Sequence, residues 1–493
     1  MTAFSGIGNG PLTERLIRLA REELVSFHMP GHKNGRLYRG NEQNDTLLPS
    51  FLPQLDVTEI PGSDHLHNPT GVIGEAQKRA AAVFGSESAY FLVNGSTGGI
   101  YAMITAAADP GDEILINRNA HQSVYNACLL GGITPRYIQT ELDPHLGVPL
   151  SPTPEQVSQA LTRWPGVKGV VITRPTYHGF VTDLAEIARR IHQQNKVLLV
   201  DEAHGAHLIL SEKLPPSAMA CGADASVQST HKTLSAFTQA AMLHVQGTRM
   251  DRDRLEWMLR LYQSSSPSYL LMSSLDAAVS LALNPGPLWM ERLLDQLQEL
   301  RKRVSAISGL LFTGSHGYRP DHQEVDPTRL WMDLHQSGWN GYEVDTALRQ
   351  RWGIQVEMAD LRGALALVSI GNTEKDLDRL GEALYGLSEE KGDRNRELTA
   401  SAGFYPPPRE LPLVRHSLRE ASLAHQEWVP LNEAEGKISA RSVIPYPPGV
   451  PLVVPGEEVS RELVRYVERL HLAGIEILGI QKEETIKLKV MVM

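Results

Sequence analysis

The feature that most constrains the fold of this chain is an alternation of short apolar segments and amphipathic helical segments between residues 74 and 245. The apolar segments VVIT (170–173) and VLLV (197–200) lack polar alternation, which is typical of strands buried on both faces. The segment between them, DLAEIARRIHQQN (183–195), has the periodicity of a helix. We therefore expect a parallel sheet covered by helices, the core of a three-layer α/β domain.

The chain is 493 residues long, which predicts two or three domains. The segment before the central region is rich in Gly, Pro and His, and a second α/β pattern follows the central region. A polar, Pro-rich stretch with little periodicity then predicts a linker. We assign an N-terminal segment, a large domain, a small α/β domain, a linker and a C-terminal domain to residues 1–73, 74–310, 311–388, 389–412 and 413–493.

The composition argues against several classes of protein. A net charge of −10 is unlike that of a nucleic-acid-binding protein, which normally has a basic face. The two cysteines, Cys128 and Cys221, are too few for a disulfide framework or a cysteine-rich metal site. His28 and His32 lack neighbouring carboxylates or cysteines, so we expect no metal. With no secretory signal pattern and no run of about 20 apolar residues, we expect a soluble cytoplasmic protein that binds no membrane.

Polar side chains follow five of the expected strands, at the point where each strand ends. In a parallel sheet the carboxyl ends of the strands meet at one edge, and ligands bind there. Five polar strand ends in one sheet therefore predict a single assembled site. The five segments are Asn94–Gly99, Arg118–His121, Arg174–His178, Asp201–His204 and Ser229–Lys232.

The first of these segments, NGSTGG, opens an expected helix. Its backbone N–H groups, its hydroxyls and the helix dipole suit a phosphate group, although an ordinary N-cap is an alternative. It is not a Walker A loop, because no Gly-Lys-Ser/Thr follows, and it lacks the GxGxxG spacing of a dinucleotide fingerprint. Any phosphate bound here would therefore belong to a smaller cofactor.

Asp201 and Lys232 have the most specific chemistry of the five strand ends. Asp201 ends a buried apolar strand, so its carboxylate either caps the next helix or pairs with a protonated ring nitrogen. Small Ala203 leaves room for a flat ring, and His204 could reach a ring substituent. Taken alone, Lys232 would be read as a solvated loop lysine. It follows Asp201 by about the length of one right-handed crossover, so the two side chains can face the same crevice. With a phosphate turn beside them, these residues point to pyridoxal 5′-phosphate (PLP).

Nine motifs stand in order along nearly the whole chain: SFHMPGHKNG, DVTEIPGSDHLHNPTGVIGEAQ, FLVNGSTGGI, NRNAHQSVYNA, PTYHG, VDEAHGAH, STHKTL, QSSSPSY and PYPPGVPLVVPGE. As a set they are specific, and with them the chain resembles the ornithine/lysine/arginine decarboxylase family. The resemblance implies the three-layer, PLP-dependent transferase-like fold (fold type I), with smaller C-terminal α/β domains. The chain is similar to the short form of the family, because nothing before residue 26 could make a further N-terminal domain.

The resemblance also implies roles for the polar strand ends. Lys232 would carry PLP as a Schiff base, and Asp201 would hold the proton of the ring nitrogen. His204 would lie near the phenolic oxygen of the ring, and His121 would stack on the ring. Without the resemblance, a structural histidine at the start of its helix is an equal alternative for His121. The remaining cofactor contacts, mainly to the phosphate, would come from Ser96, Thr97, Gly98, Ser229 and His231.

A second subunit would complete each site. Ser265, in the QSSSPSY motif, stands where the family often has threonine, and it would reach into the pocket of a partner subunit. Residues 1–73 would contribute to the dimer and to the active site in the same way. The resemblance therefore implies a homodimer or a higher homo-oligomer.

The implied activity is the decarboxylation of a basic amino acid for polyamine synthesis. Arginine, giving agmatine, is favoured because short-form relatives often use it, and lysine and ornithine remain open. A carboxylate at the far end of the pocket would bind the basic side chain, and the candidates are Glu357, Asp360 and Asp64. Arg441 stands where the family often has glutamate, so this position bears on the identity of the substrate.

Two other functions stay open at this point. One fold hosts many chemistries, so an aminotransferase or another lyase is an alternative. A non-catalytic homologue is disfavoured, because both Lys232 and Asp201 are present. In a decarboxylase, either Lys232 or His121 would return a proton to the α-carbon of the substrate.

Overall fold

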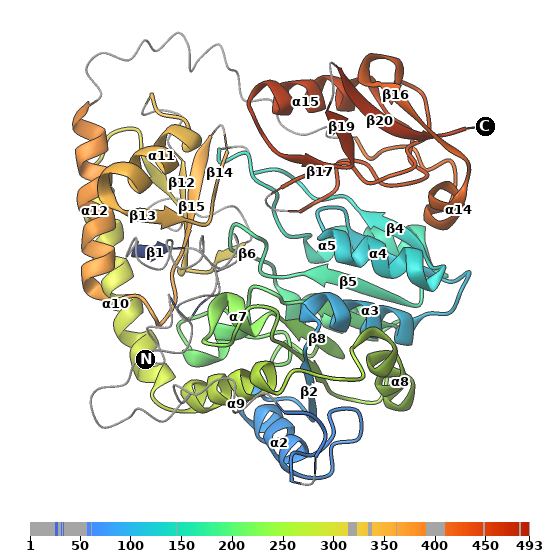
Figure 1. Cartoon of the computed structure of the whole chain (residues 1–493), viewed down its shortest axis with the longest axis horizontal. Coiled ribbons are helices and arrows are strands. Elements are labelled where there is room, and N and C mark those ends of the chain that lie inside the picture. The colour runs from blue at the N-terminus through green and yellow to red at the C-terminus, as the bar shows by residue number, and fades with distance from the viewer. Residues whose placement is uncertain are drawn as a thin grey trace, which may run out of the picture.

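The computed structural model has a large α/β domain, with a small domain (yellow to orange) and a C-terminal domain (red) packed along one end of it (Figure 1). The structure describes residues 25–27, 31, 33, 57–60, 62–143, 145–313, 323–333, 338–360, 362–390, 410–446, 449–482 and 485–492. Most of the segment 1–73 and the greater part of the linker expected at 389–412 lie outside these ranges.

The core of the large domain is a seven-stranded sheet. Neighbouring strands from β8 through β7, β5 and β3 to β4 are parallel, as the apolar segments predict. The expectation of a parallel sheet is wrong for β9, which runs antiparallel to both β8 and β2, because only the one-turn helix α7 (Thr230–Thr233) and a short loop return the chain. In spatial order the strands are β2 (Ser88–Leu92), β9 (Ala241–Val245), β8 (Ala225–Gln228), β7 (Val197–Asp201), β5 (Gly169–Thr173), β3 (Glu113–Asn117) and β4 (Thr134–Ile138).

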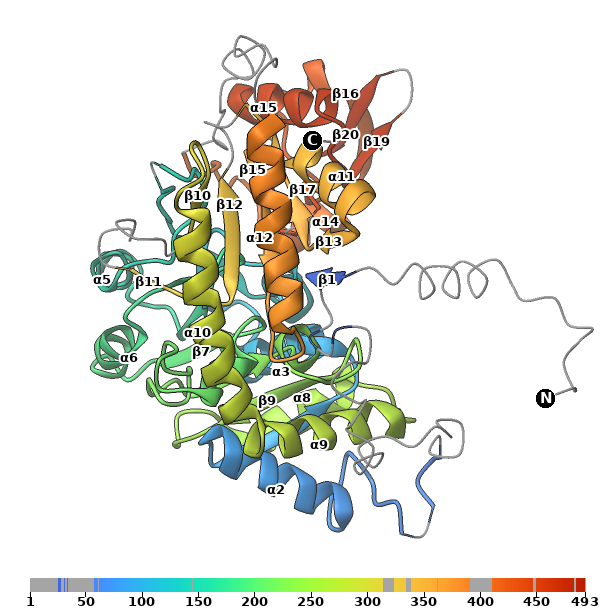
Figure 2. The same cartoon turned by 90° about the vertical axis from the view of Figure 1, so that its left-hand side faces the viewer.

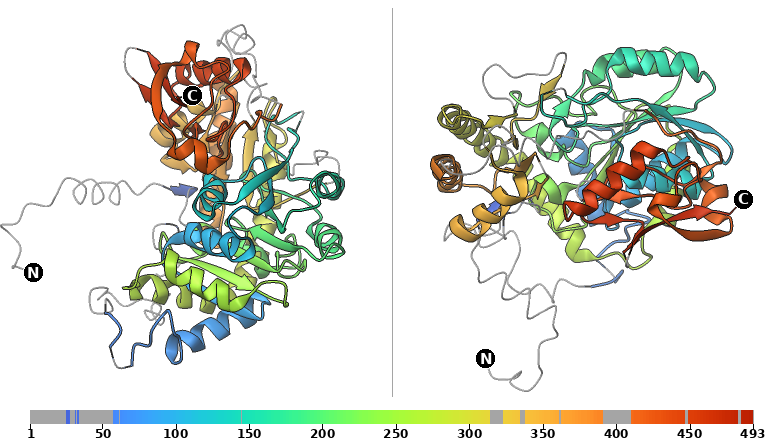
Figure 3. Two further views of the ribbon diagram at one scale, coloured as in Figure 1. Left: turned by 90° about the vertical axis from the view of Figure 1, so that its right-hand side faces the viewer. Right: turned by 90° about the horizontal axis from the view of Figure 1, so that it is seen from above.

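Helices cover both faces of this sheet, which makes the three expected layers (Figure 3). Alternate residues of β7 show the division: Leu199 packs with α3, α4 and α8, whereas Leu198 and Val200 pack with α5 and α6. Phe91 of β2 packs with α2 and α9. The helices of this domain are α2 (Val72–Phe84), α3 (Gly95–Ala107), α4 (Gln122–Gly131), α5 (Pro154–Arg163), α6 (Leu184–His192), η3 (Ala206–Leu210), α8 (Arg252–Tyr262), α9 (Tyr269–Leu283) and α10 (Gly286–Val304).

The small domain is built on a four-stranded antiparallel sheet in the order β10, β12, β15, β14. Its helix α12 lies alongside α10 of the large domain (Figure 2), and the two share one apolar core. Two pairs of short strands join distant parts of the chain, β1 with β13 and β6 with β11. The bounds are β1 (Val25–Phe27), β6 (Phe180–Val181), β10 (Leu311–Phe312), β11 (Glu324–Val325), β12 (Arg329–Asp333), α11 (Gly341–Trp352), β13 (Ile354–Val356), β14 (Met358–Ala359), β15 (Gly363–Leu367) and α12 (Glu374–Glu389).

The C-terminal domain has its own apolar core, formed mainly by α15 and a three-stranded sheet in the order β16, β20, β19. A separate pair of short antiparallel strands is formed by β17 and β18. In Figure 1, β17 lies on the side of this domain that faces the large domain. The loop after β17 contacts the start of α4, so this domain reaches the carboxyl end of the central sheet. The elements are α14 (Leu418–Leu423), β16 (Gln426–Pro430), η6 (Leu431–Glu433), β17 (Ile444–Pro445), α15 (Arg461–Leu472), β18 (Ile477–Leu478), β19 (Ile480–Lys482) and β20 (Ile486–Met491).

Candidate active site

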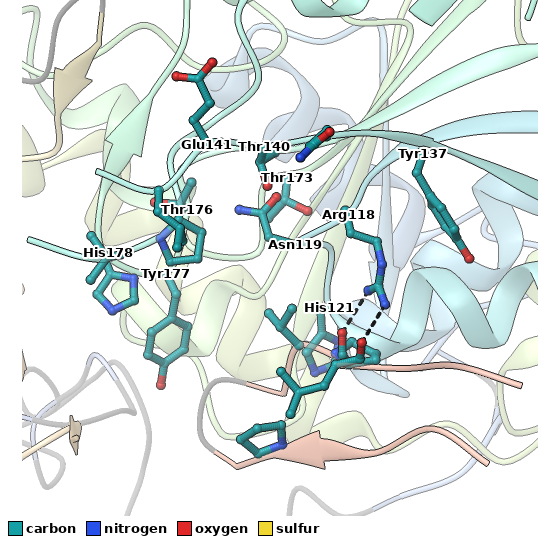
Figure 4. Close-up of a pocket in the computed structure, with 18 of the residues that line it drawn as sticks. Arg118, Asn119, His121, Tyr137, Thr140, Glu141, Thr173, Thr176, Tyr177 and His178 are labelled. Carbon is teal, nitrogen blue, oxygen red and sulfur yellow. Dashed lines mark hydrogen bonds between the residues drawn. The ribbon is translucent and has the colours of Figure 1, made fainter. Parts of the chain in front are cut away.

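The ends of β2, β3, β5, β7 and β8 open onto one cavity of about 1810 Å³. Each of the five polar segments predicted from the sequence lines this cavity with at least one residue. Figure 4 shows Thr176, Tyr177 and His178 on one side of the pocket and Arg118 and His121 on another. The small domain and the C-terminal domain supply further walls, so three domains enclose the space.

Lys232 lies in α7, directly after β8, and lines the cavity. Its Nζ atom is 3.1 Å from Nε2 of His204, which follows β7. Burial lowers the pKa of the Lys232 amine, and the nearby carboxylates of Asp201 and Glu357 partly oppose that effect. The amine is therefore more easily deprotonated, and so more nucleophilic, than a lysine in water.

Asp201 is the last residue of β7, and only 2% of its surface is exposed. Its Oδ1 atom accepts a hydrogen bond from the backbone N–H of Ala203 at 3.2 Å, and the residue lines the cavity. Burial raises the pKa of this carboxyl group, while Lys232 and the Ala203 N–H lower it. A cationic group in the cavity would therefore be the natural partner of this carboxylate.

The first turn of α3 forms the next part of the wall. Ser229 donates a hydrogen bond from its hydroxyl to Oγ of Ser96 at 2.8 Å, which joins the ends of β8 and β2. Thr97 and Gly98 follow Ser96 in the same turn, whose backbone N–H groups lie at the positive end of the helix dipole. His231 also lines the cavity, with its Nδ1 2.9 Å from the carbonyl oxygen of Ala240.

His121 is the N-cap of α4 and lies on the cavity wall. Its Nδ1 accepts a hydrogen bond from the backbone N–H of Ser123 at 3.2 Å and lies 2.8 Å from the Ser123 hydroxyl. Burial, followed by the charge of Lys232, lowers the pKa of His121 to about 4. The ring is therefore neutral at pH 7, with its proton on Nε2. His121 therefore has the structural role of an N-cap, one of the two alternatives from the sequence, and it also lines the cavity.

The three candidate carboxylates for a basic substrate lie in different surroundings. Glu357 lines the cavity and accepts a hydrogen bond from the hydroxyl of Tyr177 at 2.7 Å. Asp360 also lines it, but Oδ1 of Asp360 already accepts the backbone N–H groups of Arg362 and Gly363. Asp64 caps the start of α2 through four backbone N–H groups and has a structural role.

Six of the predicted positions do not line the cavity of their own chain. Thr97 and Gly98 follow Ser96 in α3 and Ser229 is hydrogen-bonded to Ser96, whereas Asp64, Ser265 and Arg441 have other surroundings. Ser265 lies with His65, His67 and Arg260 around a separate hollow of about 320 Å³. Arg441 is exposed on the C-terminal domain, with its guanidinium 5.9 Å from the centre of the Trp428 ring. Any role of these two residues in catalysis would therefore need a second subunit.

Several buried charges near the site were missed in the sequence. Arg329, at the start of β12, donates from Nη2 to the backbone oxygen of His204 at 2.9 Å and lies 3.5 Å from Asp326. Arg118, after β3, forms a buried ion pair of 3.2 Å with Glu457 of the C-terminal domain. Arg118 belongs to one of the five polar segments at strand ends, so the sequence pattern could have indicated it as a site residue. Arg329 and Glu457 lie outside these segments, and no pattern around them predicts a site.

Within the described ranges, no group of three or more His, Cys, Asp or Glu side chains is arranged to hold a metal ion. His28 and His32, the pair considered from the sequence, lie outside those ranges. Every helix in the described part of the chain falls short of the length and apolar character that crossing a membrane requires.

A solved structure with the same architecture is the lysine decarboxylase LdcF of Francisella novicida. It superposes with a TM-score of 0.76 at 20% sequence identity, covering 98% of this chain and 81% of that one. The likeness establishes the fold, and it confirms the fold class expected from the sequence, the PLP-dependent transferase-like fold of type I. The chain therefore has the fold of type I.

Sequence comparison identifies the family within that class. The family model "Orn/Lys/Arg decarboxylase, major domain" matches residues 10–313, and the model of the C-terminal domain of the same family matches residues 411–483. Arginine decarboxylase of Bacillus subtilis is 34% identical over 95% of both chains. Lysine decarboxylase LdcA of Pseudomonas aeruginosa is 26% identical over 93% of this chain and 75% of its own length. The protein belongs to the Orn/Lys/Arg decarboxylase family, and the prediction of an amino acid decarboxylase is confirmed.

The residues around the cavity fit PLP, the cofactor that this family implies. A buried carboxylate (Asp201) suits a ring-nitrogen cation, and a deprotonatable amine (Lys232) suits the aldehyde. Two buried polar atoms at the cavity, Oγ1 of Thr173 and Nδ1 of His204, have no hydrogen-bond partner among the described residues. A bound polar molecule would satisfy such atoms, whose burial alone is unfavourable.

Proposed function

We propose that this protein is a PLP-dependent decarboxylase of a basic amino acid, with L-arginine as the favoured substrate and agmatine as its product in polyamine synthesis. The observation that carries the proposal is that Lys232, Asp201 and Glu357 line the same cavity. The relatives support arginine, since the identity to the arginine decarboxylase is 34% and that to the lysine decarboxylase is 26%.

PLP, when bound, supplies an electron sink for the bond that breaks at the α-carbon of the substrate. In this proposal Lys232 binds the cofactor covalently and Asp201 holds the proton on its ring nitrogen. His121 faces the ring and His204 lies at its phenolic oxygen. The phosphate is bound at the start of α3 and α7 by Ser96, Thr97, Gly98, Ser229 and His231.

Glu357 is the proposed partner of the basic side chain of the substrate. It reaches the cavity from the small domain, and Tyr177, which follows β5 of the large domain, orients its carboxylate. Asp360 is a weaker candidate, since two backbone N–H groups already occupy its Oδ1. The wall as a whole favours a cation, because eight Asp and Glu residues line it against three Lys and Arg residues.

Lys232 is the better proposed proton carrier of the two residues considered from the sequence. The pKa of His121 is lowered to about 4, so few His121 rings are protonated at pH 7. Lys232 keeps a titratable amine at the cavity, in contact with neutral His204. In this proposal, the Lys232 amine returns the proton to the α-carbon after CO₂ leaves.

A homodimer or higher homo-oligomer, in the cytoplasm, is part of the proposal. Ser265 lies outside the cavity of its own chain, so the contact to the cofactor that the resemblance implies would come from a partner subunit. Residues 1–73 would join that interface.

The test is an assay of the purified enzyme with PLP and either L-arginine, L-lysine or L-ornithine. We expect equal amounts of CO₂ and amine, with agmatine formed faster than cadaverine or putrescine. Formation of a keto acid without CO₂ would identify an aminotransferase instead. Absence of turnover with all three amino acids would contradict the proposal and direct attention to Arg441.

A further inference from the structure

The loop after β17 in the C-terminal domain contacts His121 directly. The backbone N–H of Gln122 donates to the carbonyl oxygen of Gly449 at 3.1 Å. A Cβ atom added to Gly449 would lie 3.0 Å from Cδ2 and 3.1 Å from Nε2 of His121. Ser123 holds the Nδ1 side of the same ring, so Gly449 and Ser123 confine it from two edges.

Arg118 holds this loop against the large domain. Its guanidinium donates to the carbonyl oxygens of Pro451 at 2.8 Å and Leu452 at 3.0 Å, and its Nη2 lies 3.2 Å from Oε2 of Glu457. Figure 4 shows Arg118 directed at the C-terminal segment beside His121. Glu457 is 1% exposed and also accepts the backbone N–H of Val454 at 2.8 Å, which closes the loop on itself.

We infer that Gly449 and the Arg118–Glu457 ion pair are positioning residues that set the ring of His121 for the cofactor. The inference rests on the proposed function, in which His121 faces PLP. The C-terminal domain then has a task in the active site, although it supplies none of the proposed cofactor contacts. Gly449 is the last residue of the PYPPG stretch in the ninth motif; Pro447 and Pro448 of that stretch lie outside the described residues.

Position 449 requires glycine for two reasons. Its φ of 84° lies in the left-handed region, and any side chain would press on the imidazole. The two effects are separable with Gly436 of the same domain, whose φ is 76° and whose added Cβ would meet nothing within 4 Å. Gly436→Ala therefore reproduces the backbone cost of Gly449→Ala without the contact to His121.

The experiment compares G449A, G436A and wild type by thermal unfolding, by the dissociation constant for PLP, and by the visible circular dichroism of bound PLP. We expect G449A and G436A to lower Tm by similar amounts. Only G449A should weaken PLP binding, by about tenfold, and change the dichroism, since contacting residues are energetically coupled. Equal PLP binding in G449A and G436A would overturn the inference.

A double-mutant cycle shows whether the effect passes through His121. In the H121A background, G449A should weaken PLP binding by less than about twofold, because the ring that Gly449 positions is gone. An undiminished effect in that background would overturn the inference. These readouts need no substrate, so they are independent of which amino acid is decarboxylated. Failure of the wild type to bind PLP would overturn the proposed function and this inference together.

E457Q provides the same test without backbone strain, should G449A fail to fold. Glutamine keeps an oxygen for the Val454 N–H but removes the charge opposite Arg118. We expect weaker PLP binding than in wild type, again only when His121 is present. The control is E427Q, which removes an exposed carboxylate of the same domain 3.9 Å from Lys437 and should leave PLP binding unchanged. Equal behaviour of E457Q and E427Q would overturn the role of the ion pair.

Discussion

Nζ of Lys232 lies 3.1 Å from Nε2 of His204, across the ends of two neighbouring parallel strands. Burial, followed by the charge of Lys232, lowers the pKa of His204 well below its usual value, so its ring stays neutral. A neutral ring nitrogen can accept a hydrogen bond from the lysine amine. His204 therefore orients the amine toward the cavity without adding a charge to it.

The lowered pKa of Lys232 should appear in the rate at which the cofactor-free enzyme captures PLP. The neutral amine is the reacting form, so the rate should rise with pH and then reach a plateau. The midpoint of this rise should lie below the usual lysine pKa of 10.5. Asp201 raises the pKa of this amine, so D201N should move the midpoint to still lower pH. Stopped-flow absorbance measures the rate, and a midpoint at or above 10.5 would contradict the effect of burial.

Replacement of Asp201 by asparagine should reduce kcat by about 10²–10³, because the developing charge loses its buried partner. Asparagine keeps an oxygen for the Ala203 N–H, so the fold should be retained. Asp183→Asn is the matched control, since Asp183 caps α6 by accepting the N–H of Glu186. A D201N enzyme with the kcat of the D183N control would show that Asp201 has no part in the chemistry.

Glu357→Gln should raise KM for the basic amino acid by about ten- to a hundredfold, since a cationic group loses its partly buried counter-charge. The dissociation constant for PLP should change little. Tyr177→Phe should have a smaller effect in the same direction, because Tyr177 only orients the carboxylate. Asp360→Asn should mainly lower stability, through the turn that its Oδ1 holds. Steady-state kinetics of the three variants measures these effects on KM. A larger increase of KM in D360N than in E357Q would show that Asp360, and not Glu357, binds the basic side chain of the substrate.

Stability should fall as the pH is lowered through the range in which histidines ionise. Burial lowers the pKa of His178 to about 3, whereas the unfolded chain takes up this proton near the usual 6.5. Between these values the unfolded state binds more protons, so folding loses up to about 1.4 kcal/mol per pH unit for this residue. Urea unfolding at several pH values measures the slope. H178F should have a smaller slope between pH 6.5 and 4, and an unchanged slope would show that His178 is protonated in the folded protein.

Much of the site could be predicted from the sequence because it is built from strand ends. Buried parallel strands are recognisable by their apolar residues, and their carboxyl ends must meet, so Asp201 and Lys232 could be placed together. The direction of β9 could not be predicted in this way. It depends on how the chain turns after α7, and an apolar strand reads the same in both directions.

The walls supplied by other domains were harder to predict. Glu357, Asp360 and Asp64 are all acids in polar segments, and only the groups that bond to their oxygens tell them apart. The contact between Gly449 and His121 depends on the docking of the C-terminal domain, which no local pattern describes. Arg118 and Glu457 stand far apart in the chain, so their pairing follows from the same docking.

The most direct test of the account is to identify the lysine that binds the cofactor. The enzyme is saturated with PLP, reduced with borohydride to make the link permanent, digested, and its peptides are analysed by mass spectrometry. We predict one pyridoxyl group per chain, on Lys232, and no label, no yellow absorbance and no turnover in K232A. A label on another lysine, or a K232A enzyme that still decarboxylates basic amino acids, would contradict the account.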